Sequence, residues 1–452
     1  MRVRVEPCAP ARLNGETECP ARCLCGEEQS ELNNVFAGKP EKPVTRKKNT
    51  HYISADGIAL NLTFCFLLSL RVCIFVFPKF PTYPLYPMAN ENLTNAKTAK
   101  NDEFYTQYHD IEAEMSAYLE YNPDVFRGKT VLMPCDDPES SNFTRYFAAK
   151  FAELGLKKLI STSFAQESKH FKSDWQPTLF ETENPRFCAE KTAVCGKIFT
   201  LTHDTNGNGV IDIDDLEWEY LKGTGDFRSP EVTALRDEAD IIITNPPFSL
   251  FREFLAWIVE ADKQFAIIGN MNAITYKEVF PLIKDNKIWL GATIHSGDRE
   301  FQIPPEYPVT ASGWRVDEFG NKFIRVKGVR WFSNLEHGRR HQPLALMTME
   351  DNLRYNKKMK GKEAYECYDN YDAIEVPFTN AIPSDYEGVM GVPISFLDKY
   401  CPEQFEILGC SYDYGRPEEW DKDIRMSPIV EGRNIYKRLF IRGYSKSWLY
   451  RK

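Results

Sequence analysis

The four residues Asn245-Pro246-Pro247-Phe248 carry the most specific chemical signal in this chain. The Asn245 side chain and the Pro246 backbone each offer a carbonyl oxygen, and the prolines hold both acceptors on a stiff loop beside an aromatic ring. Such a set suits a planar exocyclic amine, because two N–H groups donated to the oxygens would free the nitrogen lone pair to attack an electrophilic methyl group. We therefore predict that Asn245, Pro246, Pro247 and Phe248 form a methyl-transfer site, with a plain Asn-Pro turn as the alternative.

The residues before this loop predict how it is positioned. Residues 239–244 form a short run rich in isoleucine, which is typical of a buried parallel strand. The two prolines cannot continue a sheet, so the chain must leave it at the carboxyl end of this strand. Open α/β sheets bind their ligands at that edge.

Residues 129–275 alternate predicted strands and helices. Strands are expected at 129–134, 157–164, 239–244 and 264–269. One helix is expected at 143–154, where Gly155 ends it. Two more helices are expected, one after a Ser229-Pro230 cap and one after a Ser249 cap. An irregular insertion is expected at 165–187, and a hairpin at 197–203 and 216–221. The pattern predicts an α/β fold with a doubly wound, Rossmann-like parallel sheet.

The two ends of the chain differ from this middle part. Beyond about residue 276, aromatic and basic segments predict a second domain of mixed α+β structure, running to residue 452. Residues 1–87 hold 6 of the 12 cysteines and an apolar run at 58–77 of nearly transmembrane length. We interpret residues 1–87 as a translated upstream extension or an appendage outside the fold; a single membrane anchor is the alternative.

The cysteines after residue 87 are scattered without CxxC spacing, which is typical of reduced thiols. Cys19, Cys23 and Cys25 have no matching fourth ligand close by, so we predict no metal site there. These features favour a cytoplasmic protein that is not embedded in a membrane.

A basic segment at residues 322–362 predicts a nucleic-acid contact, although the net charge of the chain is −9. The segment holds 11 Lys/Arg against 3 Asp/Glu, with aromatic residues interleaved, and this mixture suits phosphate neutralisation and base stacking. A solvated charged face is the alternative. The candidate DNA contacts are Arg325, Lys327, Arg330, His337, Arg339, Arg340, His341 and Lys357.

Four further strings complete a family pattern around the Asn-Pro-Pro-Phe loop. They are Asp-Glu-Phe-Tyr-Thr-Gln at 102–107, Cys-Asp-Asp-Pro-Glu-Ser-Ser-Asn-Phe at 135–143, Gly-Asp-Phe-Arg-Ser at 225–229 and Val-Met-Gly-Val-Pro at 389–393. In this order they resemble the EcoRI-type family of adenine-specific DNA methyltransferases, over about residues 88–452. The resemblance implies a methyltransferase domain at 88–275 and a target-recognition domain at 276–452.

The resemblance also implies S-adenosylmethionine as methyl donor, no metal, and an adenine swung out of double-stranded DNA. A restriction endonuclease acting on the same site is an expected partner. The residues at family positions for the cofactor are Phe104, Tyr105 and Thr106 at its methionine end, Asp136, Asp137, Ser141 and Asn142 at its amino-acid moiety, and Asp226 and Phe227 at its adenine.

Two features depart from the usual cofactor pattern. The loop at 135–143 contains no glycine, and Ser161, Thr162 and Ser163 stand where an acidic residue is expected for the ribose. The cofactor residues could also be ordinary helix caps and core residues. Two other functions therefore stay open: a methyltransferase for RNA or protein glutamine, and a DNA-binding protein with a degenerate cofactor pocket.

A second motif spans Asp204–Asp215 and fits the spacing of a calcium-binding loop, with oxygen-bearing side chains at positions 1, 3, 5, 9 and 12 and glycine at position 6. Its last ligand is aspartate rather than glutamate, and its flanks have strand-like patterns. Asn-Gly pairs also favour hairpin turns. We expect a hairpin without a calcium site.

Overall fold

Short β-branched runs build the centre of the molecule, as the sequence predicts. In the computed structural model, which describes residues 104–138, 141–165, 185–295, 298–303, 307, 313–411 and 428–444, four of these runs pair in parallel. Their order is β2 (Lys158–Ser163), β1 (Thr130–Met133), β5 (Ile241–Thr244) and β6 (Gln264–Asn270). Every residue of β1 and β5 is buried, which explains why neither strand alternates apolar and polar residues.

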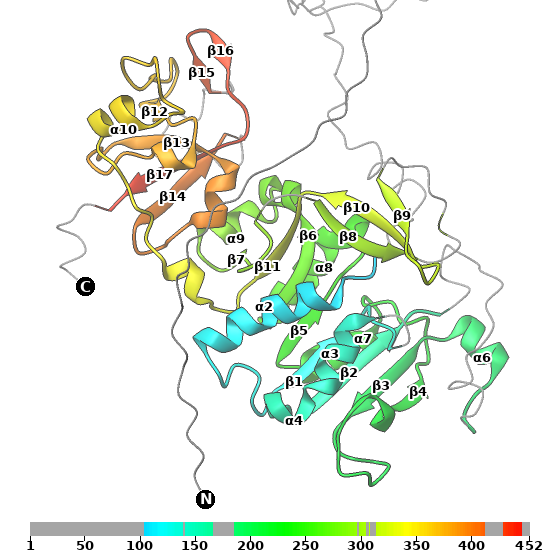
Figure 1. Cartoon of the computed structure of the whole chain (residues 1–452). Coiled ribbons are helices and arrows are strands. Elements are labelled where there is room, and N and C mark those ends of the chain that lie inside the picture. The colour runs from blue at the N-terminus through cyan, green and yellow to red at the C-terminus, as the bar shows by residue number, and fades with distance from the viewer. Residues whose placement is uncertain are drawn as a thin grey trace, which may run out of the picture. The chain divides into compact units, whose positions relative to one another are not determined.

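Antiparallel strands extend this parallel centre on both sides, so the sheet is mixed and has eight strands (Figure 1). The hairpin β3 (Lys197–Leu201) and β4 (Glu217–Tyr220) continues from β2 and confirms the predicted hairpin. On the other side, β11 (Val329–Ser333) pairs with β6, and β7 (Trp289–Leu290) pairs with β11. The predicted parallel sheet is therefore confirmed for its four central strands.

Helices cover both faces of the sheet because successive side chains of a strand point to opposite faces. Val131 and Met133 lie in one apolar core, and Leu132 lies in the other. The first core includes α2 (Tyr108–Tyr121), α3 (Asn142–Ala149) and α4 (Phe151–Leu154). The second includes α7 (Pro230–Glu238), α8 (Phe251–Glu260) and α9 (Phe280–Lys284).

The helix ends show where local signals succeed and fail. Ser229 caps α7 by accepting a hydrogen bond from the Val232 N–H (3.2 Å), as predicted. The helix predicted at 143–154 is broken into α3 and α4 at Lys150, and Gly155 ends it with φ +63°. The predicted Ser249 cap is wrong: Phe248–Leu250 forms a 3₁₀ turn (η3), and α8 begins one residue later without a side-chain cap.

Residues after 276 form strands and short helices, in agreement with the predicted mixed composition. Three strands make a small antiparallel sheet in the order β8 (Asp298–Ile303), β10 (Lys322–Lys327), β9 (Trp314–Val316). Another sheet has the order β12 (Ala373–Glu375), β13 (Val389–Pro393), β17 (Arg438–Gly443), β14 (Phe405–Cys410). The remaining elements are α6 (Ala189–Val194), η2 (Ile213–Asp215), η4 (Met271–Thr275), η5 (Gly338–His341), α10 (Met349–Tyr355), η6 (Thr379–Ala381), η7 (Ile394–Lys399), β15 (Ile429–Val430) and β16 (Arg433–Asn434).

Two predicted segments lie outside the described residues, namely the extension at 1–87 and most of the insertion at 165–187. Within the described ranges, no helix has the length and apolar character needed to cross a membrane. The six cysteines found in those ranges are all free thiols, as their spacing predicts.

Candidate active site

The carboxyl ends of β1 and β5 bring the predicted site residues together. The two strands are neighbours, but the chain runs from β1 to β2 on one side and from β5 to β6 on the other. Open α/β sheets bind their ligands at the carboxyl edge beside such a switch point. The loop that begins at Cys135 and the loop that begins at Asn245 both start at this edge, and Phe104 contacts the second loop.

Asn245 has one satisfied end and one unsatisfied end. Its side-chain Nδ2 donates to the backbone carbonyl of Phe104 at 2.7 Å. Because that carbonyl can only accept, the amide nitrogen must face it, and Oδ1 points elsewhere. Oδ1 is buried and has no hydrogen-bond partner. An unmatched buried acceptor costs about 1–3 kcal/mol, so this oxygen is poised for an N–H donor from outside the chain.

Phe248, in the same loop as Asn245, packs in a cluster of aromatic rings. Its ring centroid is 5.6 Å from that of Phe104 and 6.5 Å from that of Phe301, and Phe104 and Phe301 are 5.8 Å apart. Phe301 belongs to β8, whose Gln302 exchanges two backbone hydrogen bonds with Tyr105 at 2.9 and 3.1 Å. The small sheet therefore borders the site, which no local pattern in the sequence indicates.

The buried side chain of Asp136, just after β1, connects the carboxyl ends of β1 and β5. One carboxylate oxygen accepts from the Ser141 hydroxyl at 2.7 Å and the other from the Thr244 hydroxyl at 2.5 Å. Burial raises the pKa of Asp136 to about 6. Since Thr244 directly precedes Asn245, this buried carboxyl fixes the start of the Asn-Pro-Pro-Phe loop. Thr244 was not among the predicted residues; a hydroxyl that closes an apolar strand is its only sequence signal.

Thr106, Ser141 and Asn142, which are also expected near the methionine part of the cofactor, are linked to this edge of the sheet by hydrogen bonds. Asn142 donates from Nδ2 to the Thr106 carbonyl at 2.8 Å, and Ser141 caps α3 by accepting from the Phe143 N–H at 3.1 Å. The Thr106 hydroxyl and the Gln107 side-chain nitrogen are buried without partners. They are further polar atoms available to a ligand.

The side chains of Asp226 and Phe227, which the resemblance assigns to the cofactor's adenine, contact other residues of the chain. Arg228 donates to both Asp226 oxygens, at 3.0 Å from Nε and 2.7 Å from Nη2, and these bonds lower the pKa of Asp226. The Phe227 ring is buried against Phe254 and Trp257, with centroids 5.0 and 5.6 Å away. Both side chains are therefore occupied by protein partners.

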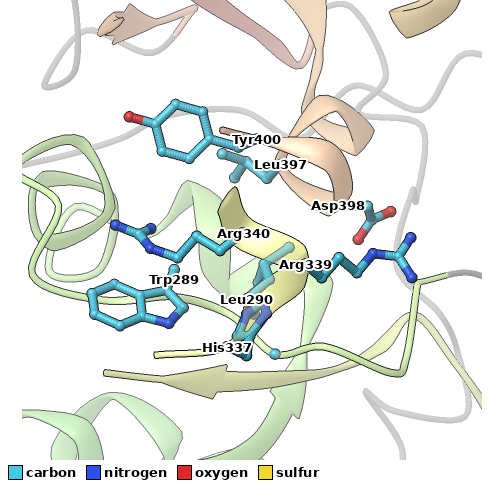
Figure 2. Close-up of a pocket in the computed structure, with 9 residues that line it drawn as sticks. Trp289, Leu290, His337, Arg339, Arg340, Leu397, Asp398 and Tyr400 are labelled. Carbon is cyan, nitrogen blue, oxygen red and sulfur yellow. Dashed lines mark hydrogen bonds between the residues drawn. The ribbon is translucent and has the colours of Figure 1, made fainter. Parts of the chain in front are cut away.

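Three of the eight predicted DNA contacts are buried. Arg330 pairs with Asp398 (Nε to Oδ1, 3.0 Å), with 5% and 11% of the two side chains exposed. Arg340 pairs with Glu336 at 3.1 Å. Its guanidinium carbon lies 3.9 Å from the centroid of the Trp289 ring. Figure 2 shows the two side chains together.

His337 is the third buried residue, and its Nε2 lies 3.1 Å from the Leu290 carbonyl oxygen. Burial lowers the pKa of His337 to about 4, so this ring is neutral at pH 7.

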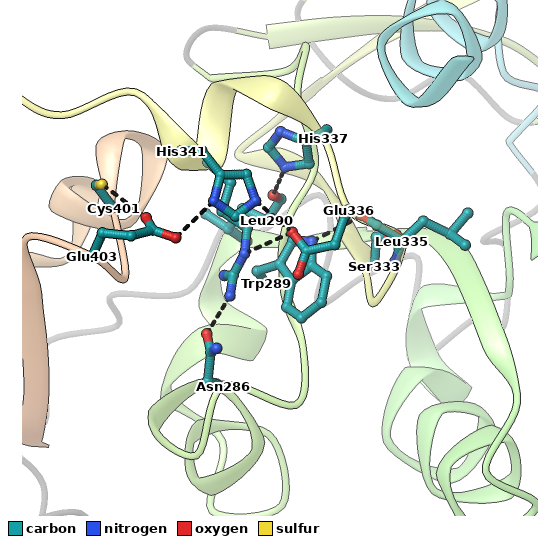
Figure 3. Close-up of polar contacts among 11 residues, drawn as sticks. Asn286, Trp289, Leu290, Ser333, Leu335, Glu336, His337, His341, Cys401 and Glu403 are labelled. Atoms are coloured by element: carbon teal, nitrogen blue, oxygen red, sulfur yellow. Dashed lines mark hydrogen bonds and ion pairs between the residues drawn. The ribbon is translucent and has the colours of Figure 1, made fainter. Parts of the chain in front are cut away.

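His341 is half-buried between two carboxylates, as Figure 3 shows. Its ring nitrogens lie 3.0 Å from Glu336 and 2.8 Å from Glu403, and its ring stacks on Tyr121. The other four predicted contacts are exposed: Arg325, Lys327, Arg339 and Lys357. These four are placed to meet a ligand that arrives from solvent.

The Asp204–Asp215 loop joins β3 to β4, and its carboxylates bind its own backbone. Asp204 accepts from the N–H groups of Gly207 (2.6 Å) and Gly209 (2.7 Å), and Asp215 accepts from that of Thr205 (2.9 Å). Over the described part of the chain, no group of three or more His, Cys, Asp or Glu residues is arranged to hold a metal.

Comparison with known proteins places this site in a family. The family described as "Adenine-specific methyltransferase EcoRI" matches residues 92–443. Type II methyltransferase M.EcoRI of Escherichia coli is 44% identical over 320 residues, covering 71% of this chain and 89% of that protein. Type II methyltransferase M.MpnI of Mycoplasma pneumoniae is 36% identical over 318 residues, covering 70% and 84%. Type II methyltransferase M.MgeORF184P of Mycoplasma genitalium is 34% identical over 323 residues, covering 71% and 86%.

No solved structure matches the chain. The family match and the relatives confirm the predicted resemblance and do not favour an RNA or protein-glutamine methyltransferase. The chain therefore belongs to the EcoRI family of adenine-specific methyltransferases, and it is an enzyme of that class.

Proposed function

We propose that this methyltransferase transfers a methyl group from S-adenosylmethionine to the exocyclic amine of an adenine swung out of double-stranded DNA. The observation that carries this proposal is the buried, unpartnered Oδ1 of Asn245. The Phe104 carbonyl fixes the other end of the same amide at 2.7 Å, so the acceptor is oriented before substrate arrives. An oriented acceptor beside Phe248 and the Pro246 carbonyl matches the two N–H groups and the flat ring of adenine.

The roles in the reaction follow from this arrangement. Asn245 Oδ1 and the Pro246 carbonyl each accept one N–H of the adenine amine, so its lone pair is directed at the methyl carbon. The sulfonium of S-adenosylmethionine supplies the electrophilic methyl group. The N–C bond forms as the C–S bond breaks, S-adenosylhomocysteine leaves, and the amine releases one proton to solvent. Both oxygens stabilise the positive charge that develops on nitrogen, without reorganising.

The carboxyl ends of β1 and β5 suit the methionine part of the cofactor. The buried Thr106 hydroxyl has no partner, and Asn142 and Asn245 donate to the carbonyls of Thr106 and Phe104. Phe104, Tyr105, Asp137 and Asn142 complete the proposed set of contacts. Asp136 and Ser141 hold the two loops in position, because the Asp136 oxygens accept hydrogen bonds from the Ser141 and Thr244 hydroxyls. For the adenine part, Asp226 would have to exchange an Arg228 bond for the cofactor amine, while Phe227 supports it from the core.

We propose that DNA phosphates meet the exposed basic side chains of Arg325, Lys327, Arg339 and Lys357. His341 would need to break a contact with a carboxylate before it could contact DNA. The buried side chains of Arg330, His337 and Arg340 support the residues of this surface without reaching the DNA. In this proposal residues 276–452 recognise the target sequence, and an endonuclease cutting the same sequence is the expected partner.

The test is direct product analysis with the purified full chain. Incubation with methyl-labelled S-adenosylmethionine and unmethylated genomic DNA should yield N6-methyladenine in the nucleoside digest, and total RNA should yield none. The Asn245→Ala variant should yield far less from DNA in the same time, and Asn206→Ala, in the β3–β4 loop, should match the unaltered chain. Label appearing in RNA or in cytosine, or full activity of Asn245→Ala, would overturn the proposal.

A further inference from the structure

The outer strand of the small sheet exposes large apolar side chains close to the proposed target-base site. β9 is an edge strand that pairs only with β10 among the described strands. Trp314 and Val316 are each 47% exposed. Exposed tryptophan next to a site is uncommon in a soluble fold and indicates a contact surface.

Strand register shows which way these side chains point. Ile324 of β10 lies opposite Phe301 on one side and opposite Trp314 on the other. Directly opposite residues of antiparallel strands share a face, so Phe301, Ile324 and Trp314 form one row. Two strand spacings separate the ends of this row by about 10 Å. Val316 shares the face because it lies two residues from Trp314.

This face of the sheet is buried at one end and open at the other. At β8, Phe301 is buried and its ring contacts those of Phe104 and Phe248. At β10, Ile324 is buried in the same core. At β9 the row ends in the half-exposed Trp314. The apolar surface that begins at Phe248 thus continues outward to the edge of the sheet.

Most charged side chains of this small sheet lie on its other face, although Lys322 shares the face of Trp314 because it lies directly opposite Val316. Arg315, between Trp314 and Val316, donates to Glu300 at 2.9 Å and lies over the Phe323 ring. Arg325 and Glu300 are opposite each other on that same outer face. At its outer end the Trp314 face presents the half-exposed indole ring, and a flat aromatic ring suits the face of a base better than a phosphate group.

We propose that Trp314 packs on a base of the target DNA strand next to the extruded adenine, and that Val316 supports it. Extrusion leaves a neighbouring base without its stacking partner, and a tryptophan at the edge of the target-base surface can replace that partner. The inference rests on the proposed function, because it takes DNA as substrate. It assigns a DNA-contact residue outside both the Asn-Pro-Pro-Phe loop and the basic segment.

The test compares three variants of the full chain on one duplex substrate. Trp314→Ala should raise the DNA KM by about 5- to 150-fold, because base–aromatic stacking has this range of strength. Trp314→Phe should restore most of the loss. The matched control is Phe319→Ala at the β9–β10 turn, where Phe319 is 81% exposed and the turn is held by Asp317. It should behave like the unaltered chain.

Two further readouts separate a DNA contact from a structural role. The affinity for S-adenosylmethionine and the melting temperature should stay unchanged in Trp314→Ala. Duplexes lacking one base beside the target adenine should weaken binding of the unaltered chain but change binding of Trp314→Ala much less.

Equal KM values for Trp314→Ala and the unaltered chain would overturn this inference, and so would a lower melting temperature that Trp314→Phe does not rescue. Absence of DNA methylation by the unaltered chain would instead overturn the proposed function.

Discussion

The Asn-Pro-Pro-Phe loop and the basic segment at 322–362 both have residue types suited to binding, but the structure treats them differently. At the loop, Asn245 keeps a buried acceptor without a partner. In the basic segment, Arg330 and His341 already pair with Asp398 and Glu403. The difference shows that a functional group is defined by the hydrogen bonds left unmade, rather than by residue type alone.

Sequence distance explains why the two regions could not be distinguished beforehand. The partner of Asn245 is a backbone carbonyl 141 positions away, yet a single carbonyl cannot satisfy both ends of an amide. Arg330 and His341 contact carboxylates 68 and 62 positions away, so both side chains already have partners within the chain. Each prediction below tests one side of this comparison.

The largest expected effect is on the buried ion pair between Arg330 and Asp398. Arg330→Ala leaves the Asp398 carboxylate buried without its partner, so the free energy of unfolding should fall by about 3–5 kcal/mol. Denaturant unfolding measures this change. Lys327→Ala, on the exposed face of β10, is the control and should stay within about 0.5 kcal/mol of the unaltered chain. A stable Arg330→Ala variant that has lost DNA affinity would make Arg330 a DNA contact.

The next effect concerns the buried Asp136 carboxyl group, which binds the hydroxyls of Ser141 and Thr244 before the Asn-Pro-Pro-Phe loop. Burial raises the pKa of Asp136 to about 6, so its protonated form favours the folded state. Its contribution to stability should be complete below about pH 4 and should be lost as the pH rises through about 6. Asp136→Asn should remove that part of the pH dependence. If this variant and the unaltered chain had the same dependence of stability on pH between pH 4 and 7, the buried Asp136 carboxyl group would not be the titrating group.

A smaller effect is expected at the surface. Reversing Arg325 and Lys327 to glutamate should weaken DNA binding and reduce the slope of log affinity against log salt by about one per lost phosphate contact. Affinity for free S-adenosylmethionine should not change. The buried Arg340 should contribute nothing to the slope in the conservative Arg340→Lys variant. An unchanged slope for the surface pair, or a reduced one for Arg340→Lys, would reverse the assignment.

The smallest effect is expected from calcium. The carboxylates of Asp204 and Asp215 already accept hydrogen bonds from their own loop. Adding calcium or a chelator should therefore move the melting temperature by less than about 1 °C. A chelator-sensitive transition that Asp215→Asn abolishes would show that this loop binds calcium.

Local patterns predicted the parts of the fold that depend on neighbouring residues. The isoleucine run of β5, the strands β1, β2 and β6, and the Ser229 cap were all found where composition placed them. The Ser249 cap failed because the two prolines lead into a 3₁₀ turn before α8 begins. The additions to the central sheet, β7 and β11, were missed because β11 pairs with β6, some 60 residues away, and β7 pairs only with β11 among the described strands.

The candidate site divides in the same way. Asn245, Pro246 and Phe248 could be predicted because their chemistry is local to one loop. Phe301, Thr244 and Trp314 could not, because their places follow from strand register and long-range contact. The burial of Arg330 and Arg340 also depends on segments that only the fold brings together.

The central claim is that the unpartnered Asn245 oxygen acts in the transition state. Its direct test is single-turnover methylation by Asn245→Ala, with enzyme and S-adenosylmethionine in excess over DNA. Loss of one preorganised acceptor should slow the chemical step by about 10²–10³-fold, while the affinities for DNA and S-adenosylmethionine stay near those of the unaltered chain. A folded Asn245→Ala variant that methylates at the unaltered rate, or one whose only defect is DNA affinity, would contradict the account.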